Sequence, residues 1–130
     1  MKNITCDILV VGAGVAGLCS AIAAARKGLS TILIEKESEI GIKIKGECIR
    51  KEARIFNTIF GDGVVFVGDS GGHVGAIAAP GIISSMTTGY DCTNFISDSI
   101  KAEGIVTKEM VKEFLTEFEK SPMQKWLRNE

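Results

Sequence analysis

A glycine-rich turn near the N-terminus constrains the fold more than any other feature of this sequence. The turn, Gly12–Gly17, has the pattern GxGxxG and directly follows the apolar, branched run Cys6–Val11. An alanine-rich segment of helical pattern comes next and ends at Gly28, and Ser30–Glu35 then has the composition of a second strand. We therefore expect a right-handed βαβ unit in a parallel sheet, with its first strand buried on both faces.

The same turn predicts a site for a phosphate-bearing ligand. In this pattern Gly12 permits the tight turn, Gly14 lets the backbone approach a pyrophosphate, and Gly17 lets helix and strand pack closely. The helix N-terminus at Val15 and Ala16 offers N–H groups to the phosphates. The pattern does not distinguish FAD from NAD, and a glycine turn that binds nothing is the structural alternative.

Glu35 stands at the end of the second predicted strand. An acidic residue about 20 residues after the glycine turn accepts hydrogen bonds from a ribose hydroxyl in this kind of site. A carboxylate there leaves no room for a 2′-phosphate. The sequence therefore argues against NADP.

The middle of the chain predicts one more helix and one more strand. Glu47–Phe60 has apolar residues at helical spacing, Gly61–Gly63 is a turn, and Val64–Val67 is a third apolar run. We predict that Val64–Val67 lies beside the 6–11 strand, with the 31–35 strand on its other side. The expected fold class is α/β, with a small three-stranded parallel sheet and flanking helices.

Two helices are predicted in the remainder. Pro80-Gly81 opens a long helix that runs to about Glu103 and stops at Gly104. Its serine and threonine content gives weak helix propensity, so packing must hold it. Thr107 can cap a last amphipathic helix, which Ser121-Pro122 ends.

Length and composition bound the class of protein. A chain of 130 residues is about one domain, which we divide into 1–60, 61–104 and 105–130. Fifteen basic and sixteen acidic side chains give no strong footprint for nucleic acid. The four cysteines fit no zinc pattern, so we expect reduced thiols, no metal site and a cytoplasmic location.

An uncharged run, Ile8–Ala25, approaches the length of a membrane span. Its glycines, and Asp7 directly before it, favour a strand, a turn and a buried helix instead. We therefore expect no transmembrane segment.

A second glycine-rich motif lies further along the chain. Val67–His73 follows the third predicted strand, and Ala79–Ile82 leads into the long helix. This motif resembles the second flavin-binding motif of the geranylgeranyl reductase family of FAD-dependent oxidoreductases. Asp69, Gly81, Ile82 and Gly89 have the family's relative offsets.

Other segments share the resemblance. The first motif matches, including Asp7 and the pair Glu35-Lys36, and Lys45–Cys48 is similar to the family's Gly-Glu segment, here Gly46-Glu47. The resemblance implies that the chain binds FAD, with Asp69 near the ribitol and pyrophosphate. Backbone N–H groups at Gly81 and Ile82 would face the N1/O2 side of the flavin ring, where reduced flavin is negatively charged.

The sequence also departs from the family. Ala76 stands where the family usually has proline, and Pro80 where it usually has glycine. The family's long central section, which supplies the substrate cavity, has no counterpart between Glu47 and Phe60. We therefore expect a cofactor domain whose substrate site is completed by a homo-oligomer or a partner protein that covers the flavin.

Two single residues are weak catalytic candidates. Cys48 could be a redox-active or proton-donating thiol, and His73 a proton donor, although packing or a backbone contact explains each as well. The functional hypotheses are a flavin oxidoreductase, a non-catalytic module that holds FAD or NAD, and a vestigial chain without ligand.

Overall fold

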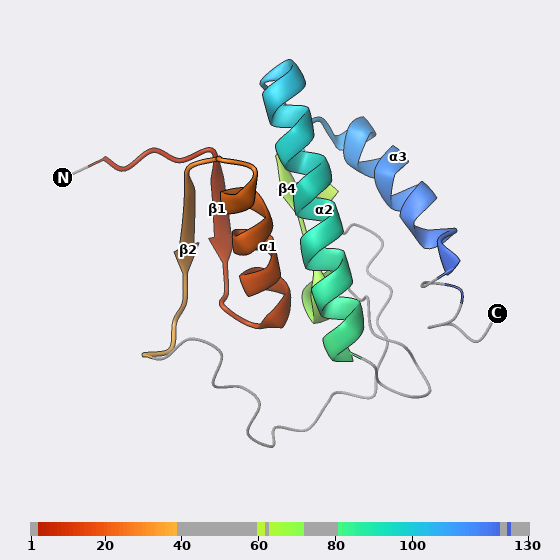
Figure 1. Cartoon of the computed structure of the whole chain (residues 1–130), viewed down its shortest axis with the longest axis horizontal. Helices are drawn as coiled ribbons and strands as arrows, with labels where there is room; N and C mark the ends of the chain where they lie inside the picture. The colour runs from red at the N-terminus through yellow and green to blue at the C-terminus, as the bar shows by residue number, and fades with distance from the viewer. Residues whose placement is uncertain (1–2, 39–59, 62, 72–80, 123–124, 126–130) are drawn as a thin grey trace.

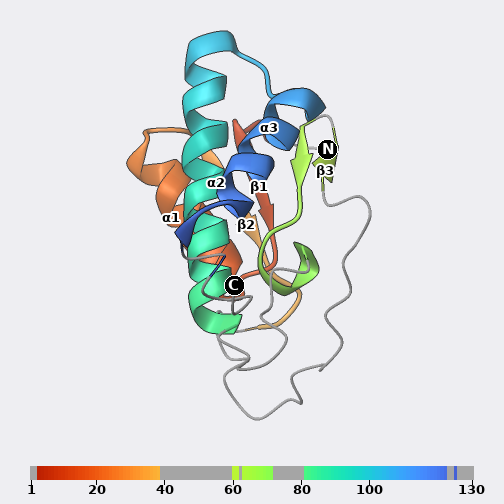
Figure 2. The same cartoon turned by 90° about the vertical axis from the view of Figure 1, so that its right-hand side faces the viewer.

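The computed structural model describes residues 3–38, 60–61, 63–71, 81–122 and 125. Helices α1 and α2 lie on one side of the molecule and the strands lie on the other (Figures 1 and 2). In chain order the elements are β1 (Ile8–Val11), α1 (Val15–Arg26), β2 (Thr31–Ile34), β3 (Phe60–Gly61), β4 (Val64–Val65), the 3-10 turn η2 (Gly68–Gly71), α2 (Gly81–Glu103) and α3 (Lys108–Glu119).

The predicted βαβ unit is present. Strands β1 and β2 pair in parallel, from Ile8 opposite Thr31 to Val11 opposite Ile34. The side chain of Asp7 anchors the start of this ladder: its Oδ2 accepts from the backbone N–H of Ser30 at 2.7 Å and from the Ser30 hydroxyl at 2.9 Å. This confirms an α/β fold with a small parallel sheet and flanking helices.

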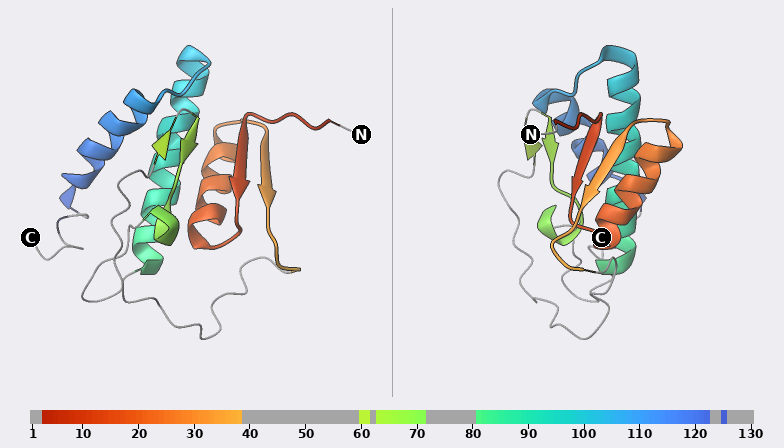
Figure 3. Two further views of the ribbon diagram at one scale, coloured as in Figure 1. Left: turned by 180° about the vertical axis from the view of Figure 1, so that it is seen from behind. Right: turned by 90° about the vertical axis from the view of Figure 1, so that its left-hand side faces the viewer.

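The third predicted strand does not join that sheet. Among the described residues the parallel sheet has two strands, and β4 pairs antiparallel with β3 in a separate sheet. This β3–β4 hairpin lies on the side of β1 opposite β2, as the predicted order requires, but without pairing to β1 (Figure 3). Its turn bonds elsewhere, since the N–H of Gly63 donates to the carbonyl of Val106 at 3.2 Å.

The expected helix over 47–60 is wrong at its last residue. Phe60 belongs to β3, where it pairs with Val65. Residues 47–59 of that prediction lie outside the described residues, as do the loop positions 39–46 and 72–80.

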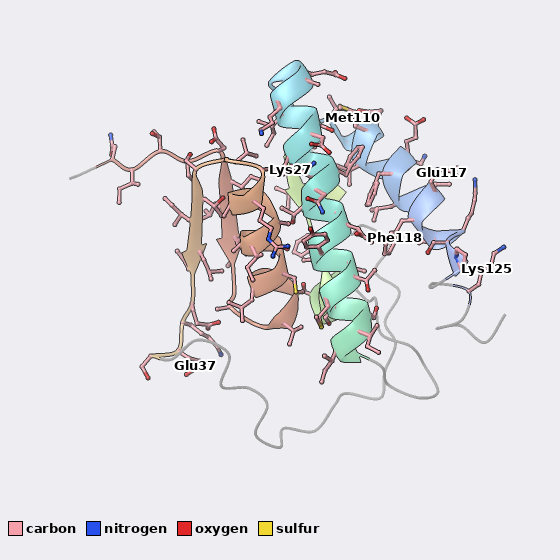
Figure 4. All side chains as sticks on the ribbon, in the orientation of Figure 1. Lys27, Glu37, Met110, Glu117, Phe118 and Lys125 are labelled. Atoms are coloured by element: carbon pink, nitrogen blue, oxygen red, sulfur yellow. The ribbon has the colours of Figure 1, made fainter. Side chains whose placement is uncertain are left out.

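Helix α2 lies between α1 and α3 and packs against both. It contacts α1 along its length, and a salt bridge of 2.7 Å between Lys27 and Asp98 joins the two helices near their C-termini (Figure 4). On its other side Cys92 packs with Val111 and Leu115 of α3. The predicted helix ends are confirmed: α2 stops before Gly104, which has φ +71, and Thr107 caps α3 by accepting from the N–H of Met110.

One face of the parallel sheet is open among the described residues. Alternate residues of a strand point to opposite faces, and Val10 is buried toward α1. On the opposite face Leu9 is 55% exposed, Val11 75% and Ile34 46%. The expectation that β1 is buried on both faces is therefore wrong in the described part, because α1 and α2 cover only one face.

None of the described helices is both long enough and apolar enough to cross a membrane.

Candidate functional site

The glycine turn lies between the end of β1 and the start of α1. Gly12 has φ +100, a conformation that side chains disfavour, and its N–H donates to the carbonyl of Ile34 at 2.8 Å. A Cβ at Gly17 would overlap the carbonyl oxygen of Gly12, whereas a Cβ at Gly14 would meet no atom of the described residues within 4 Å. The lack of a side chain at Gly17 thus lets α1 pack closely on the end of β1. Gly14 faces no described residue.

The first turn of α1, in the described part of the chain, contains no side-chain group of its own that would neutralise the helix N-terminus. Gly14 is the N-cap and provides no side-chain hydrogen bond, and the first turn contains no acidic residue. The first bond within the helix runs from the N–H of Leu18 to the carbonyl of Gly14 at 2.9 Å. The helix itself therefore provides no acceptor for the N–H groups of Val15, Ala16 and Gly17. These groups lie at the positive end of the helix dipole, which suits the binding of a phosphate.

Glu35 follows β2 and lies against the glycine turn. Its Oε2 accepts from the N–H of Ala13 at 2.6 Å, and its Oε1 accepts from the N–H of Lys36 at 2.7 Å. The Lys36 ammonium is directed to Glu37, 3.4 Å from Oε1 of that residue. The structure therefore brings Glu35 together with the glycine turn, while Lys36 points along the chain after β2.

The second motif begins beside the first helical turn of α1. Gly68 has φ +63, and its N–H donates to the hydroxyl of Thr88 on α2 at 3.1 Å. A Cβ at Gly68 would stand 2.8 Å from the Cβ of Ala16. Asp69 belongs to η2, although its side chain is outside the described part. The two glycine-rich motifs, more than 50 residues apart, thus meet at Ala16.

Gly81 is the first residue of α2, as predicted, and Ile82 is 61% exposed beside it. Four other predicted residues lie outside the described part of the chain: Gly46, Glu47, Cys48 and His73. The same holds for the two departures from the family pattern, Ala76 and Pro80. Their roles stay predictions.

The sequence analysis named Gly89 of α2 only as part of the second motif and gave Thr88 no role, so it missed how these two residues hold the motifs together. The hydroxyl of Thr88 accepts from Gly68 and donates to the carbonyl of Ser84 at 2.9 Å. Gly89 lets the backbone of α1 approach, since a Cβ there would overlap the carbonyl oxygen of Ala16. The sequence did contain a signal for this role of α2. Serines and threonines surround a glycine in a segment whose intrinsic helix propensity is weak.

Burial keeps two of the described thiols, Cys19 and Cys92, in the protonated form. Burial, with a smaller contribution from the charge of Asp91, raises the pKa of Cys92 to about 12. Burial also raises the pKa of Cys19. Both thiols therefore stay protonated at neutral pH. Within the described residues no three His, Cys, Asp or Glu side chains gather to hold a metal ion.

The N-terminal segment is similar to known proteins. Residues 7–41 match the family model of FAD dependent oxidoreductases. A digeranylgeranylglycerophospholipid reductase from Picrophilus torridus is 54% identical over 46 residues, which is 35% of this chain and 12% of that protein. The corresponding reductase from Methanosarcina mazei is 46% identical over 55 residues, 38% of this chain and 14% of that protein.

A relative with a different name also matches. A 4-oxocyclohex-2-ene-1-carboxylate 5-dehydrogenase from Sinomonas cyclohexanicum is 55% identical over 40 residues, 31% of this chain and 7% of that protein. No solved structure matches the chain. The chain therefore matches only about a tenth of the length of these relatives, in a fragment of the FAD-binding domain, and the resemblance to the geranylgeranyl reductase family is confirmed for this fragment.

Proposed function

We propose that this chain is an FAD-binding flavoprotein that resembles the cofactor domain of geranylgeranyl reductases. The observation that supports the proposal most is the glycine turn at a helix N-terminus that has no side-chain cap, with the carboxylate of Glu35 against the turn. Residues 7–41, which contain all of these groups, match the FAD dependent oxidoreductase family model.

The first motif would hold the ADP half of the cofactor. The N–H groups at the start of α1 bind the pyrophosphate, and the absence of an acidic residue in the first turn of α1 avoids repulsion there. Glu35 accepts from the ribose of the adenosine, and the lack of a basic residue at that position disfavours a 2′-phosphate. The fit of this half rests on residues whose positions the structure describes.

The second motif would serve the flavin half. Backbone N–H groups at Gly81 and Ile82 lie at the start of α2, the positive end of a 23-residue helix. Asp69 lies in η2, directly after Gly68, which packs against Ala16 in the first turn of α1. When bound, the flavin would supply two-electron redox chemistry, and the role of this chain is to bind and orient it.

Redox turnover would require a further protein surface. The apolar side chains Leu9, Val11 and Ile34 on the open face of the sheet support the idea that a second copy or a partner protein completes the substrate site. Light scattering at high protein concentration tests self-association, and a monomer at all concentrations would contradict the homo-oligomer. The cytoplasmic location expected from the sequence likewise stays a prediction.

A second candidate is a non-catalytic module that holds FAD or NAD. The span of the family match favours it, because residues 7–41 include only β1, α1 and β2. These elements would bind the ADP portion that both dinucleotides share.

The spectrum of the purified protein separates these outcomes. We expect flavin absorbance that survives dialysis, or uptake of added FAD with quenched flavin fluorescence. Protein that stays colourless and takes up no FAD would refute the proposal. Competition by NAD at similar concentration would favour the non-catalytic module, and bleaching by NADH or NADPH would favour the oxidoreductase.

A further inference from the structure

Among the described residues, the carboxylate of Glu35 accepts hydrogen bonds from three backbone N–H groups. Ala13 lies 2.6 Å from Oε2, and Lys36 and Glu37 lie 2.7 and 3.2 Å from Oε1. Two of these donors belong to the chain after β2, and the third belongs to the glycine turn. The carboxylate therefore contacts the glycine turn directly, in addition to the chain after β2.

We propose that Glu35 is a positioning residue that holds the glycine turn in its binding shape before any nucleotide is present. The turn Gly12–Gly17 contains three glycines, which on their own allow many backbone conformations. Two bonds tie the turn to consecutive residues at the end of β2: Ile34 accepts from Gly12, and Glu35 accepts from Ala13. The second of these depends on a side chain and can therefore be removed by mutation.

The environment of Ala13 makes this bond important. Ala13 is 1% exposed, so water cannot readily replace the carboxylate as acceptor for its N–H. A buried N–H without a partner disfavours the conformation that buries it. Without Glu35 the turn would therefore move toward conformations that expose Ala13, and the N–H groups at the start of α1 would lose their alignment.

This role of Glu35 rests on the proposed nucleotide binding. It predicts a different effect of removing Glu35 than a ribose contact alone would. A carboxylate near a phosphate site repels the phosphate. If Glu35 contacts only ribose, its removal leaves the affinity for a ligand without ribose unchanged or raises it. If Glu35 positions the turn, its removal lowers that affinity.

Amide exchange in the ligand-free protein tests the positioning role directly. We compare the wild type with Glu35→Ala and with Glu37→Ala, which removes the same charge two residues away. Figure 4 shows Glu37 beyond the end of β2. We expect the Ala13 amide to exchange about tenfold faster or more in Glu35→Ala and at the wild-type rate in Glu37→Ala.

The amides of Ala23 and Ala24, in the middle of α1, are the internal reference. Equal Ala13 rates in all three proteins would overturn the proposal. So would a uniform rise over α1, because it would mean that Glu35 stabilises the whole unit rather than the turn. If Glu35→Ala does not fold, Glu35→Gln takes its place: its amide offers one acceptor and sets an N–H group against the remaining donors, so we expect an intermediate rise at Ala13.

Calorimetric titration with inorganic pyrophosphate, which has no ribose, is the second measurement. We expect about tenfold weaker binding in Glu35→Ala and little change in Glu37→Ala. Unchanged or tighter binding in Glu35→Ala would overturn the positioning role. If the wild type binds neither pyrophosphate nor FAD, the proposed function fails, and the exchange rates of the ligand-free protein still decide the role of Glu35.

Discussion

The two glycine-rich motifs are held in place in different ways. The first lies within one βαβ unit and is fixed by bonds among its own residues: the β1–β2 ladder, the Asp7–Ser30 pair and the bond from Ala13 to Glu35. The start of the second, at Gly68, is held through α2, by the hydroxyl of Thr88, and rests on Ala16 of α1. The first motif is therefore a local structure, and the position of the second depends on how α2 packs.

This difference assigns α2 a role in the candidate site. Gly89 packs on the backbone of α1 at Ala16, and Thr88, the residue before it, binds Gly68. The hydroxyl of Ser20 on α1 also donates to the carbonyl of Gly89 at 3.1 Å. Neighbouring residues of one helix therefore set the distance between the two motifs. Mutations at these residues should therefore distinguish changes that disturb one motif from changes that disturb both.

The largest effect should follow Gly17→Ala, because the new Cβ would overlap the carbonyl oxygen of Gly12, a backbone atom. We expect a loss of about 3 kcal/mol or more in the free energy of unfolding, measured with denaturant. Gly14→Ala is the matched control, because its Cβ meets no atom of the described residues within 4 Å and its φ of −70° suits alanine. It should keep stability within about 1 kcal/mol and still weaken FAD binding. Equal loss of stability in both variants would contradict the different roles of the two glycines.

Gly89→Ala should come next and should damage both motifs. Its Cβ would overlap the carbonyl oxygen of Ala16, so α2 must move away from α1. We expect a loss of about 2 kcal/mol in stability by denaturant unfolding, with faster amide exchange at both Ala16 and Gly68. Met86→Ala, at an exposed position of the same helix, serves as the control and should change little. An effect confined to one motif would argue against the idea that α2 holds both motifs in place.

Thr88→Val should disturb the second motif alone. The substitution conserves shape and leaves the buried N–H of Gly68 without its acceptor, at a cost of about 1 to 3 kcal/mol. Thr88→Ser keeps the hydroxyl and should retain most of the stability. We expect faster exchange at Gly68 and unchanged exchange at Ala13, by the same measurement. A matching change at Ala13 would show that the first motif is not local.

The smallest effect should be a pH dependence of the first motif. Backbone and side-chain hydrogen bonds from Ser30 lower the pKa of Asp7 from its usual 3.8. The stability from this carboxylate is therefore present above about pH 4 and is lost as the pH falls through the lower folded-state pKa. Asp7→Asn should melt below the wild type at pH 6, and thermal melts should show the difference shrinking toward pH 2.5. A difference that stays constant would mean that the carboxylate charge does not matter.

Local sequence signals predicted the first motif and the helix ends well. Gly28 and Gly104, both at positive φ, follow α1 and α2, and Thr107 caps α3. These features depend on residues within a few positions of one another. The bond from Glu35 to the turn was not predicted, because the spacing placed the residue near the turn without giving the direction of its carboxylate.

Pairing and packing between distant segments could not be predicted in the same way. The apolar run Val64–Val67 indicates a strand, but its composition does not say whether it pairs with β1 or with Phe60–Gly61. Phe60 also continues a helical spacing, and its partner Val65 overrides that pattern. The serines and threonines of α2 indicated only that packing must hold the helix.

By itself the sequence determined a βαβ unit with a glycine turn and a carboxylate near it, because chain geometry and glycine conformation act over short distances. Only the tertiary structure decided that β4 pairs with β3 and that one face of the sheet stays open in the described part. It alone also showed that Thr88 and Gly89 join the two motifs. These contacts link residues far apart in the chain, and their free energy depends on which surfaces meet, which no local pattern encodes.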